Sequence, residues 1–534
     1  MSVEASISRA ASDVPLSGRA LHSHPRLLPR LIIGAGVCWS VVFVVVGVQY
    51  ELQKYADGSL FSYSVAVQDG WAFHWHNISE RLFVYVFSHV PAEIYVELTR
   101  DARGGIAVYG FLFFVAPLLG LIATFAADRS NGRIIFSYAC ASTACLCPLV
   151  FGFPTEMWMA HALFWPALAV CHYARSGWGV GLVFAALLAL IFTHGGALLL
   201  ATAILLTLLL RGMRDPAVVR TTGVFLVIVP IWALLKTTFP PDDYDAPVLV
   251  RAELHFFDAT ILTTDLLLLV LGALASYGIA ILGLRRLIQV RVSIYAASSV
   301  GVALVVYWVC FDQALHADNR YYLRTVLLIG TTVLGVIAAL YALRADARLN
   351  LPGMFLARLM TRLASSATAQ AMAGAIALVM LVHSVETAKF VAAWANYQAA
   401  IRALAMSTMS DSTLGDSHFV SADRIGPNLN RLSWSSTTHF LSVLVAPKFA
   451  PARLVVDPKA NYFWLSCETA AASEVADRAI PTETRRLIRV HACLHRQAEL
   501  SGPRDASWEH PSWRAHLEIA SIPLRSAETS KPAP

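Results

Sequence analysis

Ionisable residues that could bind a phosphate lie in a loop between two apolar stretches near the middle of the chain. The segment from Asp312 to Arg324 contains two acids, one histidine and two arginines. Arginine is suited to bidentate binding of phosphate. The candidate phosphate-binding residues here are His316, Arg320 and Arg324. Alternatively, the two arginines pair with the neighbouring acids or extend to lipid headgroups.

Two isolated ionisable residues occupy tight turns between other apolar stretches. Glu156 is the lone acid of the turn Pro154-Thr155-Glu156-Met157-Trp158. His194 lies in the short turn Thr193-His194-Gly195-Gly196, at membrane depth. Ionisable residues at that depth are costly and usually face the interior of a helix bundle. We therefore treat both as candidate site residues.

The stretch 51–105 is the densest polar region next to an apolar run, and it includes Asp57, Asp69 and Arg81. His74 and His76 are two residues apart and could bind a metal ion, with Asp69 as a third ligand. The alternative is that both histidines, set among aromatic residues, belong to the aromatic belt at a membrane interface.

The periodicity inside this stretch predicts two kinds of element. From Phe61 to Gln68, apolar and small polar residues alternate, which favours a strand and leaves a short helix as the alternative. From Leu82 to Val90, apolar residues share one helical face, and Pro91 is expected to break that helix before Ile94 and Leu98 continue it. Such helices would lie along the bilayer surface, either sealing the bundle or forming the rim of a cavity.

The elements that must position these residues are membrane spans. Of the 534 residues, 57% are hydrophobic and 14% charged, against about 25% charged in soluble domains, which excludes a soluble enzyme. Each bilayer crossing takes about 20 apolar residues. The apolar runs predict an all-α polytopic bundle of eleven transmembrane helices, near 31–50, 106–126, 134–153, 157–174, 177–193, 195–210, 221–238, 265–283, 292–311, 323–343 and 366–386.

The distribution of positive charge predicts the orientation of these spans. With the N-terminus inside, the inner segments contain 17 arginines, whereas the short outer loops contain three Lys or Arg. Cytoplasmic loops carry such an excess, so we expect the N-terminus inside and the C-terminus outside a cytoplasmic (inner) membrane. The net charge of +6 is then a consequence of topology, and no nucleic-acid partner is expected.

The composition predicts soluble segments at both ends of the transmembrane domain, residues 31–386. Residues 1–30 have the composition of a disordered cytoplasmic tail, and 501–534 that of a flexible tail. Residues 387–500 predict a small extracytoplasmic α+β domain with a helix at Thr482–Arg496 and strands at His418–Ala422, Phe440–Ala446, Arg453–Asp457 and Tyr462–Leu465. Cys467 and Cys493 are its two cysteines and suggest a disulfide, although spacing alone cannot establish the geometry.

This layout resembles the GT-C superfamily of polytopic membrane glycosyltransferases: many spans, a long first outer loop with surface helices, and an outer C-terminal domain. The resemblance implies a polyprenyl-phosphate-linked sugar as donor. It also implies that an acid of the first outer loop, Asp57 or Asp69, acts on the acceptor or helps to hold a divalent metal ion. A second acid of the family lies in the outer turn between spans three and four, which is Glu156 here.

The expected reaction moves a sugar from a polyprenyl phosphate to an envelope glycan, lipid or protein on the outer face of the membrane. It needs a carboxylate to take the acceptor proton, for which Asp57 or Asp69 is suited. It also needs cations to stabilise the departing phosphate, for which Arg81, Arg320 or Arg324 is suited. The alternatives are a transporter or flippase of a lipid-linked or envelope substrate, and a scaffold protein that binds a partner through its outer domain.

Overall fold

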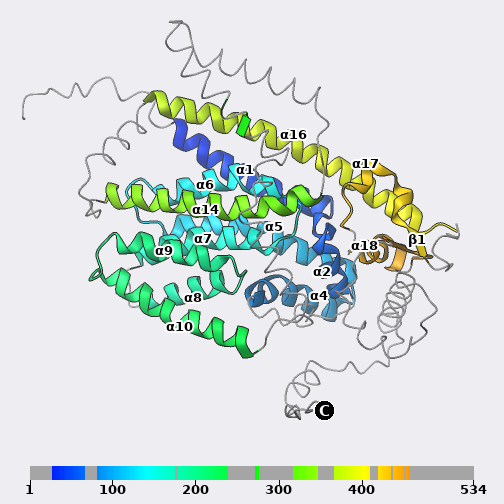
Figure 1. Cartoon of the computed structure of the whole chain (residues 1–534), viewed down its shortest axis with the longest axis horizontal. Coiled ribbons are helices and arrows are strands. Elements are labelled where there is room, and N and C mark those ends of the chain that lie inside the picture. The colour runs from blue at the N-terminus through cyan, green and yellow to red at the C-terminus, as the bar shows by residue number, and fades with distance from the viewer. Residues whose placement is uncertain are drawn as a thin grey trace, which may run out of the picture.

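The computed structural model describes residues 27–66, 81–174, 178–238, 271–272, 275, 317–346, 366–408, 419–434, 437–449 and 451–457. Helices dominate these ranges, and Figure 1 shows the long ones running side by side, with short elements gathered at one end. The predicted residues Asp69, His74, His76, His316, Cys467 and Cys493 lie outside the described residues, as does the side chain of Arg320.

Five described helices are long and apolar enough to cross a membrane. They are α1 (Leu27–Gln49), α5 (Ala102–Ala127), α10 (Pro216–Thr238), α14 (Ala317–Ala345) and α16 (Ser366–Ala405). Between them lie α6 (Ile134–Cys145), α7 (Glu156–Tyr173), α8 (Gly179–Ile191) and α9 (Ala197–Leu209). The chain is therefore a membrane-embedded helical protein. The predicted spans 265–283 and 292–311 lie almost entirely outside the described residues, so a total of eleven stays a prediction.

Helix α16 continues well beyond residue 386, where the sequence predicted the last span to end. It extends without a break to Ala405, because the added segment is rich in alanine and contains neither glycine nor proline. Its side chains bind the C-terminal end of α1: Trp394 Nε1 and Gln398 Nε2 both donate to the Tyr50 carbonyl, at 3.0 and 3.1 Å. The predicted boundary at 387 therefore falls inside a helix.

Small residues let neighbouring helices approach closely. A Cβ atom placed on Gly36 of α1 would lie 2.6 Å from Cys140 Cα of α6, and one on Gly120 of α5 would collide with the Ala162 carbonyl of α7. Such contacts between backbones replace the hydrophobic driving force that helices lack inside a bilayer.

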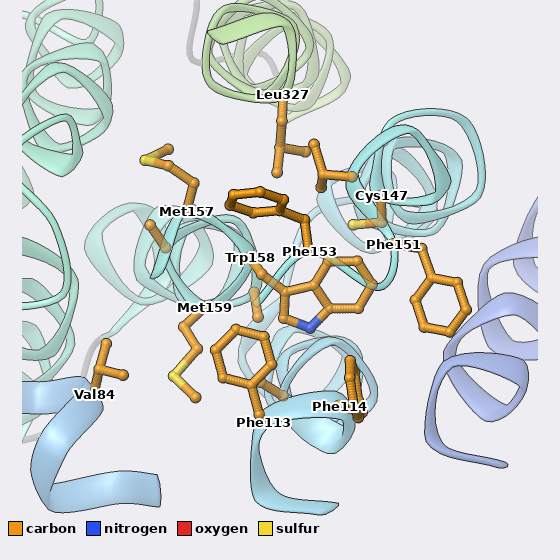
Figure 2. Packing of buried hydrophobic residues seen from close by; sticks show 14 of the residues in the cluster. Val84, Phe113, Phe114, Cys147, Phe151, Phe153, Met157, Trp158, Met159 and Leu327 are labelled. Carbon is orange, nitrogen blue, oxygen red and sulfur yellow. The ribbon is translucent and has the colours of Figure 1, made fainter. Parts of the chain in front are cut away.

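An aromatic core lies at the start of α7. Figure 2 shows Trp158 surrounded by phenylalanine side chains, among them Phe113, Phe114 and Phe151. The ring of Phe43 from α1 packs edge-on against Trp158 with centroids 4.7 Å apart, and the ring of Phe151 lies 6.0 Å from Trp158. Because Trp158 is fully buried, it fixes the first turn of α7 and the acid that begins this helix.

The stretch between α1 and α5 folds into η1 (Leu52–Lys54), α2 (Asp57–Ala66), α3 (Leu82–Val84), the π-helix η4 (Tyr85–His89) and α4 (Val90–Thr99). The predicted strand near Phe61 is wrong, and the helical alternative is confirmed. The alternation of apolar and polar residues did not indicate a strand here, because α2 is buried on all sides. Its polar side chains bind backbone carbonyls, as Ser62 Oγ does at Gln53 O, 3.2 Å, and Ser64 Oγ at Phe61 O, 2.8 Å.

The predicted break at Pro91 is also wrong, because helical structure continues from Leu82 to Thr99. Pro91 lies in the first turn of α4, where the ring is tolerated, and the wider π-helical turn comes directly before it. The exposed side of this segment is apolar: Leu82, Val86, Ile94 and Leu98 are each at least 43% exposed. An exposed apolar stripe on an outer helix fits the prediction that it lies on the membrane surface.

Beyond α16 the described chain forms a short parallel pair of strands, β1 (Phe419–Ser421) and β2 (Leu454–Val456), with Phe419 opposite Leu454. Both strands lie inside predicted ones. The strand predicted at Phe440–Ala446 is wrong: α18 (Thr438–Val445) is a fully buried helix, and a short apolar run does not distinguish these two states. The small elements η7 (Ala422–Ile425), α17 (Pro427–Asn430) and η9 (Pro447–Phe449) complete this part.

Candidate functional site

Asp57 begins α2, and the contacts around the next residue fix the position of this acid. A Cβ atom on Gly58 would lie 2.5 Å from Pro154 Cγ and would collide with the Gln53 carbonyl. The start of α2 therefore lies directly against the turn that precedes Glu156. The ring of Tyr55 packs edge-on against Phe153 of the same turn, with centroids 5.9 Å apart.

Glu156 is the first residue of α7 and forms an ion pair with Arg81. Arg81 Nη1 lies 2.9 Å from Glu156 Oε1, and the two side chains are 15% and 6% exposed. The hydroxyl of Thr155 accepts a hydrogen bond from the Met157 N–H at 3.4 Å, which caps the helix. A carboxylate in the first turn is also stabilised by the helix dipole. Glu156 is thus held in a fixed position at the start of α7.

Arg81 is positioned by a backbone contact with the turn that contains His194. The Phe83 N–H donates to the Phe192 carbonyl at 2.9 Å, which joins α3 to the end of α8. His194 Nδ1 accepts from the Gly196 N–H at 3.0 Å, so Nε2 carries the proton of the neutral ring. Burial lowers the pKa of His194 well below its usual value, and the positive charges of Arg81 and Arg324 lower it further. His194 is a neutral hydrogen-bond donor beside two arginines.

Arg324 reaches the same place from α14. Its guanidinium carbon lies 5.7 Å from the centre of the Phe153 ring, a cation–π distance. Its charge acts on both Asp57 and His194. Five predicted site residues from separate parts of the sequence are therefore neighbours: Asp57, Arg81, Glu156, His194 and Arg324.

The carboxyl group of Asp57 has an unusual environment. Burial raises its pKa from 3.8 to about 6, the charge of Glu156 raises it too, and the charges of Arg324 and Arg81 oppose this shift. Its Oδ1 atom is inaccessible to solvent and has no hydrogen-bond partner among the described residues. A buried acceptor without a partner costs stability and is typical of a functional site. Asp57 can therefore accept a proton near neutral pH.

The five residues differ in burial. Glu156 is buried, with 4% of its surface exposed, whereas Asp57, Arg81, His194 and Arg324 are half-buried. Asp57 begins α2, which lies at the same end of the bundle as α4 (Figure 1), and the contacts described above bring the other four residues to it.

The described residues suit an anion better than a metal ion. Within the ranges that the structure describes, no three potential ligands of the His, Cys, Asp and Glu types come together. Asp57 and Glu156 are the two carboxylates of the site, and two guanidinium groups act on them. Arginine repels cations and binds phosphate. The predicted metal site at His74 and His76 lies outside the described residues.

One further residue of the site could not be found from the sequence. Tyr109 of α5 is buried and interacts electrostatically with both Asp57 and Glu156. Its ring also packs against His89 with centroids 4.8 Å apart. In the sequence Tyr109 is one aromatic residue in an apolar run, so only the structure reveals its proximity to the two acids.

A second polar cluster lies deeper in the bundle and is largely self-satisfied. His161 of α7 contacts Ser142 Oγ at 2.9 Å and Cys147 Sγ at 3.3 Å, and Trp165 Nε1 donates to its ring at 3.3 Å. All four side chains are buried. Because they bind one another, we assign this cluster to helix packing.

We compared the chain with protein-family models, with curated proteins and with solved structures. None of the three comparisons found a match.

Proposed function

We propose that this protein is an integral membrane glycosyltransferase of the GT-C type, which moves a sugar from a polyprenyl phosphate to an envelope acceptor. The observation that carries the proposal is the position of Asp57. Its buried carboxylate oxygen has no hydrogen-bond partner among the described residues and lies beside two arginines and a second, ion-paired acid. A base next to phosphate-binding cations is what sugar transfer from a lipid phosphate requires.

In the proposed reaction Asp57 is the general base. The oxygen of the acceptor hydroxyl attacks the anomeric carbon of the sugar and gives its proton to Asp57. The bond between that carbon and the phosphate oxygen breaks, and the polyprenyl phosphate leaves with the bonding electrons. A pKa of about 6 leaves Asp57 mostly ionised at pH 7 and still basic enough to accept the proton.

The other residues bind and orient the donor. Arg324 and Arg81 stabilise the negative charge that grows on the leaving phosphate. Glu156 holds Arg81 in place through the 2.9 Å ion pair. His194 donates from Nε2 to a phosphate or sugar oxygen, because its Nδ1 already accepts from the Gly196 N–H. We place this site on the extracytoplasmic face of an inner membrane, as the charge distribution predicts.

The experiment is mass spectrometry of envelope glycans and polyprenyl-linked sugars from cells that lack the gene. The strain is complemented with wild type, with Asp57→Asn, with Asp69→Asn, or with Asp423→Asn, which changes an exposed acid that is not one of the site residues. We expect one sugar to disappear from a glycan and its lipid-linked donor to accumulate in the deletion strain. Wild type and Asp423→Asn should restore both pools, and Asp57→Asn should restore neither.

Two outcomes would contradict the proposal. Full complementation by Asp57→Asn would remove Asp57 as the base, and a simultaneous failure of Asp69→Asn would transfer that role to Asp69. If the glycan changed while the lipid-linked donor accumulated only on the inner leaflet, the protein would be a flippase.

A further inference from the structure

A groove runs along the outside of the bundle between α8 and α10, at the end opposite the candidate site. It is open along its length and has a volume of about 660 Å³. Val180 and Phe184 of α8 line one wall, and Val219, Val224 and Val227 of α10 line the other. The α8 residues are four positions apart and those of α10 follow a helical face, so both walls are continuous strips of apolar surface.

Two arginines lie at one end of this groove. Arg214 is exposed just before α10, and Arg220 lies in the first turns of this helix. Arg220 Nη1 donates to the Ala174 carbonyl at 2.7 Å and Nη2 to the Cys171 carbonyl at 3.5 Å, both at the C-terminal end of α7. Its Nε atom is buried without a hydrogen-bond partner among the described residues. Within the described part of the chain, no carboxylate lines the groove or pairs with either arginine. Asp215, next to Arg214 in the chain, pairs with Arg211, so this end of the groove carries net positive charge.

The length of the groove matches one leaflet of a bilayer. From Pro216 to Val227 the groove follows α10 for about 16 Å, at 1.5 Å per residue. Half of a hydrocarbon core of about 30 Å is about 15 Å. The arginines mark the end at which α10 begins, which Figure 1 shows on the opposite side of the bundle from α2. An arginine at a helix end places its charge at the membrane interface.

We propose that this groove binds one anionic phospholipid of the leaflet that faces away from the candidate site. The phosphate group lies against Arg214 and Arg220, and an acyl chain fills the apolar strip between α8 and α10. Charge complementarity selects the occupant, because a phosphatidylglycerol headgroup is anionic as a whole whereas that of phosphatidylcholine is neutral. This site is independent of the proposed transferase activity.

Two positions allow the groove to be blocked without disturbing the fold. A Cβ atom on Gly223, which lines the groove, meets nothing within 4 Å, and the same holds for Gly181 of α8, which does not line it. Gly223→Leu therefore fills the groove, and Gly181→Leu is the matched control. Arg214→Gln removes one cation from the headgroup site and leaves Arg220 in place as the cap of α7.

The test is native mass spectrometry of the purified full chain in detergent with added phosphatidylglycerol or phosphatidylcholine of the same acyl chains. We expect wild type and Gly181→Leu to bind phosphatidylglycerol preferentially. Arg214→Gln should weaken phosphatidylglycerol binding about fivefold, the loss typical of one basic residue near an anionic lipid surface, and leave phosphatidylcholine binding unchanged. Gly223→Leu should weaken binding of both lipids.

Several results would overturn the proposal. Equal binding of the two lipids by wild type would remove the role of the arginines. A loss of dimers rather than of lipid adducts in Gly223→Leu would show that a second copy of the chain occupies the groove. Unfolding of Gly223→Leu, with Gly181→Leu intact, would show that a protein segment fills the groove.

Discussion

Replacing Asp57 by asparagine should stabilise this protein while it removes the proposed activity. Burial raises the pKa of Asp57 from 3.8 to about 6, so the ionised form is less favourable in the folded chain than in the unfolded one. In the unfolded chain the carboxyl group loses its proton near pH 4. The folded chain keeps that proton until the pH approaches 6, so its stability falls between these two values and stays lower above pH 6.

The size of this effect follows from the same shift. A difference of about two units corresponds to about 3 kcal/mol at 1.36 kcal/mol per unit. For a chain of this size such a gain raises the unfolding temperature by about 2 °C.

The assay is thermal unfolding of wild type and Asp57→Asn in the same detergent, followed by intrinsic fluorescence at pH values from 4 to 8. The difference in unfolding temperature should be near zero at pH 4, grow between pH 4 and 6, and stay constant above pH 6. Asp423→Asn, which changes an exposed acid, should show no such trend. A difference that does not vary with pH, or a destabilised Asp57→Asn at pH 7.5, would refute the reasoning.

Three further changes test the neighbourhood of Asp57. Arg81→Met should destabilise the protein by roughly 3 kcal/mol in thermal unfolding, because it leaves Glu156 buried without its partner, and Arg81→Met with Glu156→Met should recover most of that loss. Gly58→Val should abolish the proposed sugar transfer, because the new side chain would force α2 away from Pro154. A photoreactive benzophenone side chain at position 98 should crosslink to phospholipid in nanodiscs, because Leu98 belongs to the apolar stripe and is 79% exposed.

For each of these expectations there is a result that would contradict it. If the double variant of the ion pair were less stable than Arg81→Met alone, the two side chains would not be compensating each other. Gly181→Val, in open space on α8, is the control for Gly58→Val and should keep full activity. Crosslinking from Leu98 to protein rather than to lipid would place α4 against another chain.

Hydropathy located the long apolar helices because a bilayer permits few structures. Every backbone polar group in the hydrocarbon core needs a partner, so an apolar run of sufficient length folds as a helix wherever it lies in the chain. The predicted spans at 31–50, 106–126 and 221–238 therefore coincide closely with α1, α5 and α10. The same logic does not locate the end of α16, because α16 extends beyond its apolar part and good helix formers continue it.

The predicted secondary structure was wrong in two segments that are buried by the rest of the protein and face neither membrane nor water. The alternation near Phe61 and the apolar run at Phe440 each suggested strands, yet the two segments are helices that pack together, with the rings of Tyr63 and Phe440 centred 5.0 Å apart. In a helix buried on all sides, periodicity carries no signal, because no face is distinguished by solvent.

The sequence by itself determined that this chain is a helical membrane protein and which residue types near its turns could bind a phosphate or accept a proton. Only the tertiary structure decided that Asp57, Arg81, Glu156, His194 and Arg324 come together, since they lie up to 267 positions apart in the chain. The physical reason is that hydropathy depends on each segment alone. Side-chain proximity depends on how segments pack, through contacts such as Gly58 on Pro154 and the Phe83 amide on the Phe192 carbonyl.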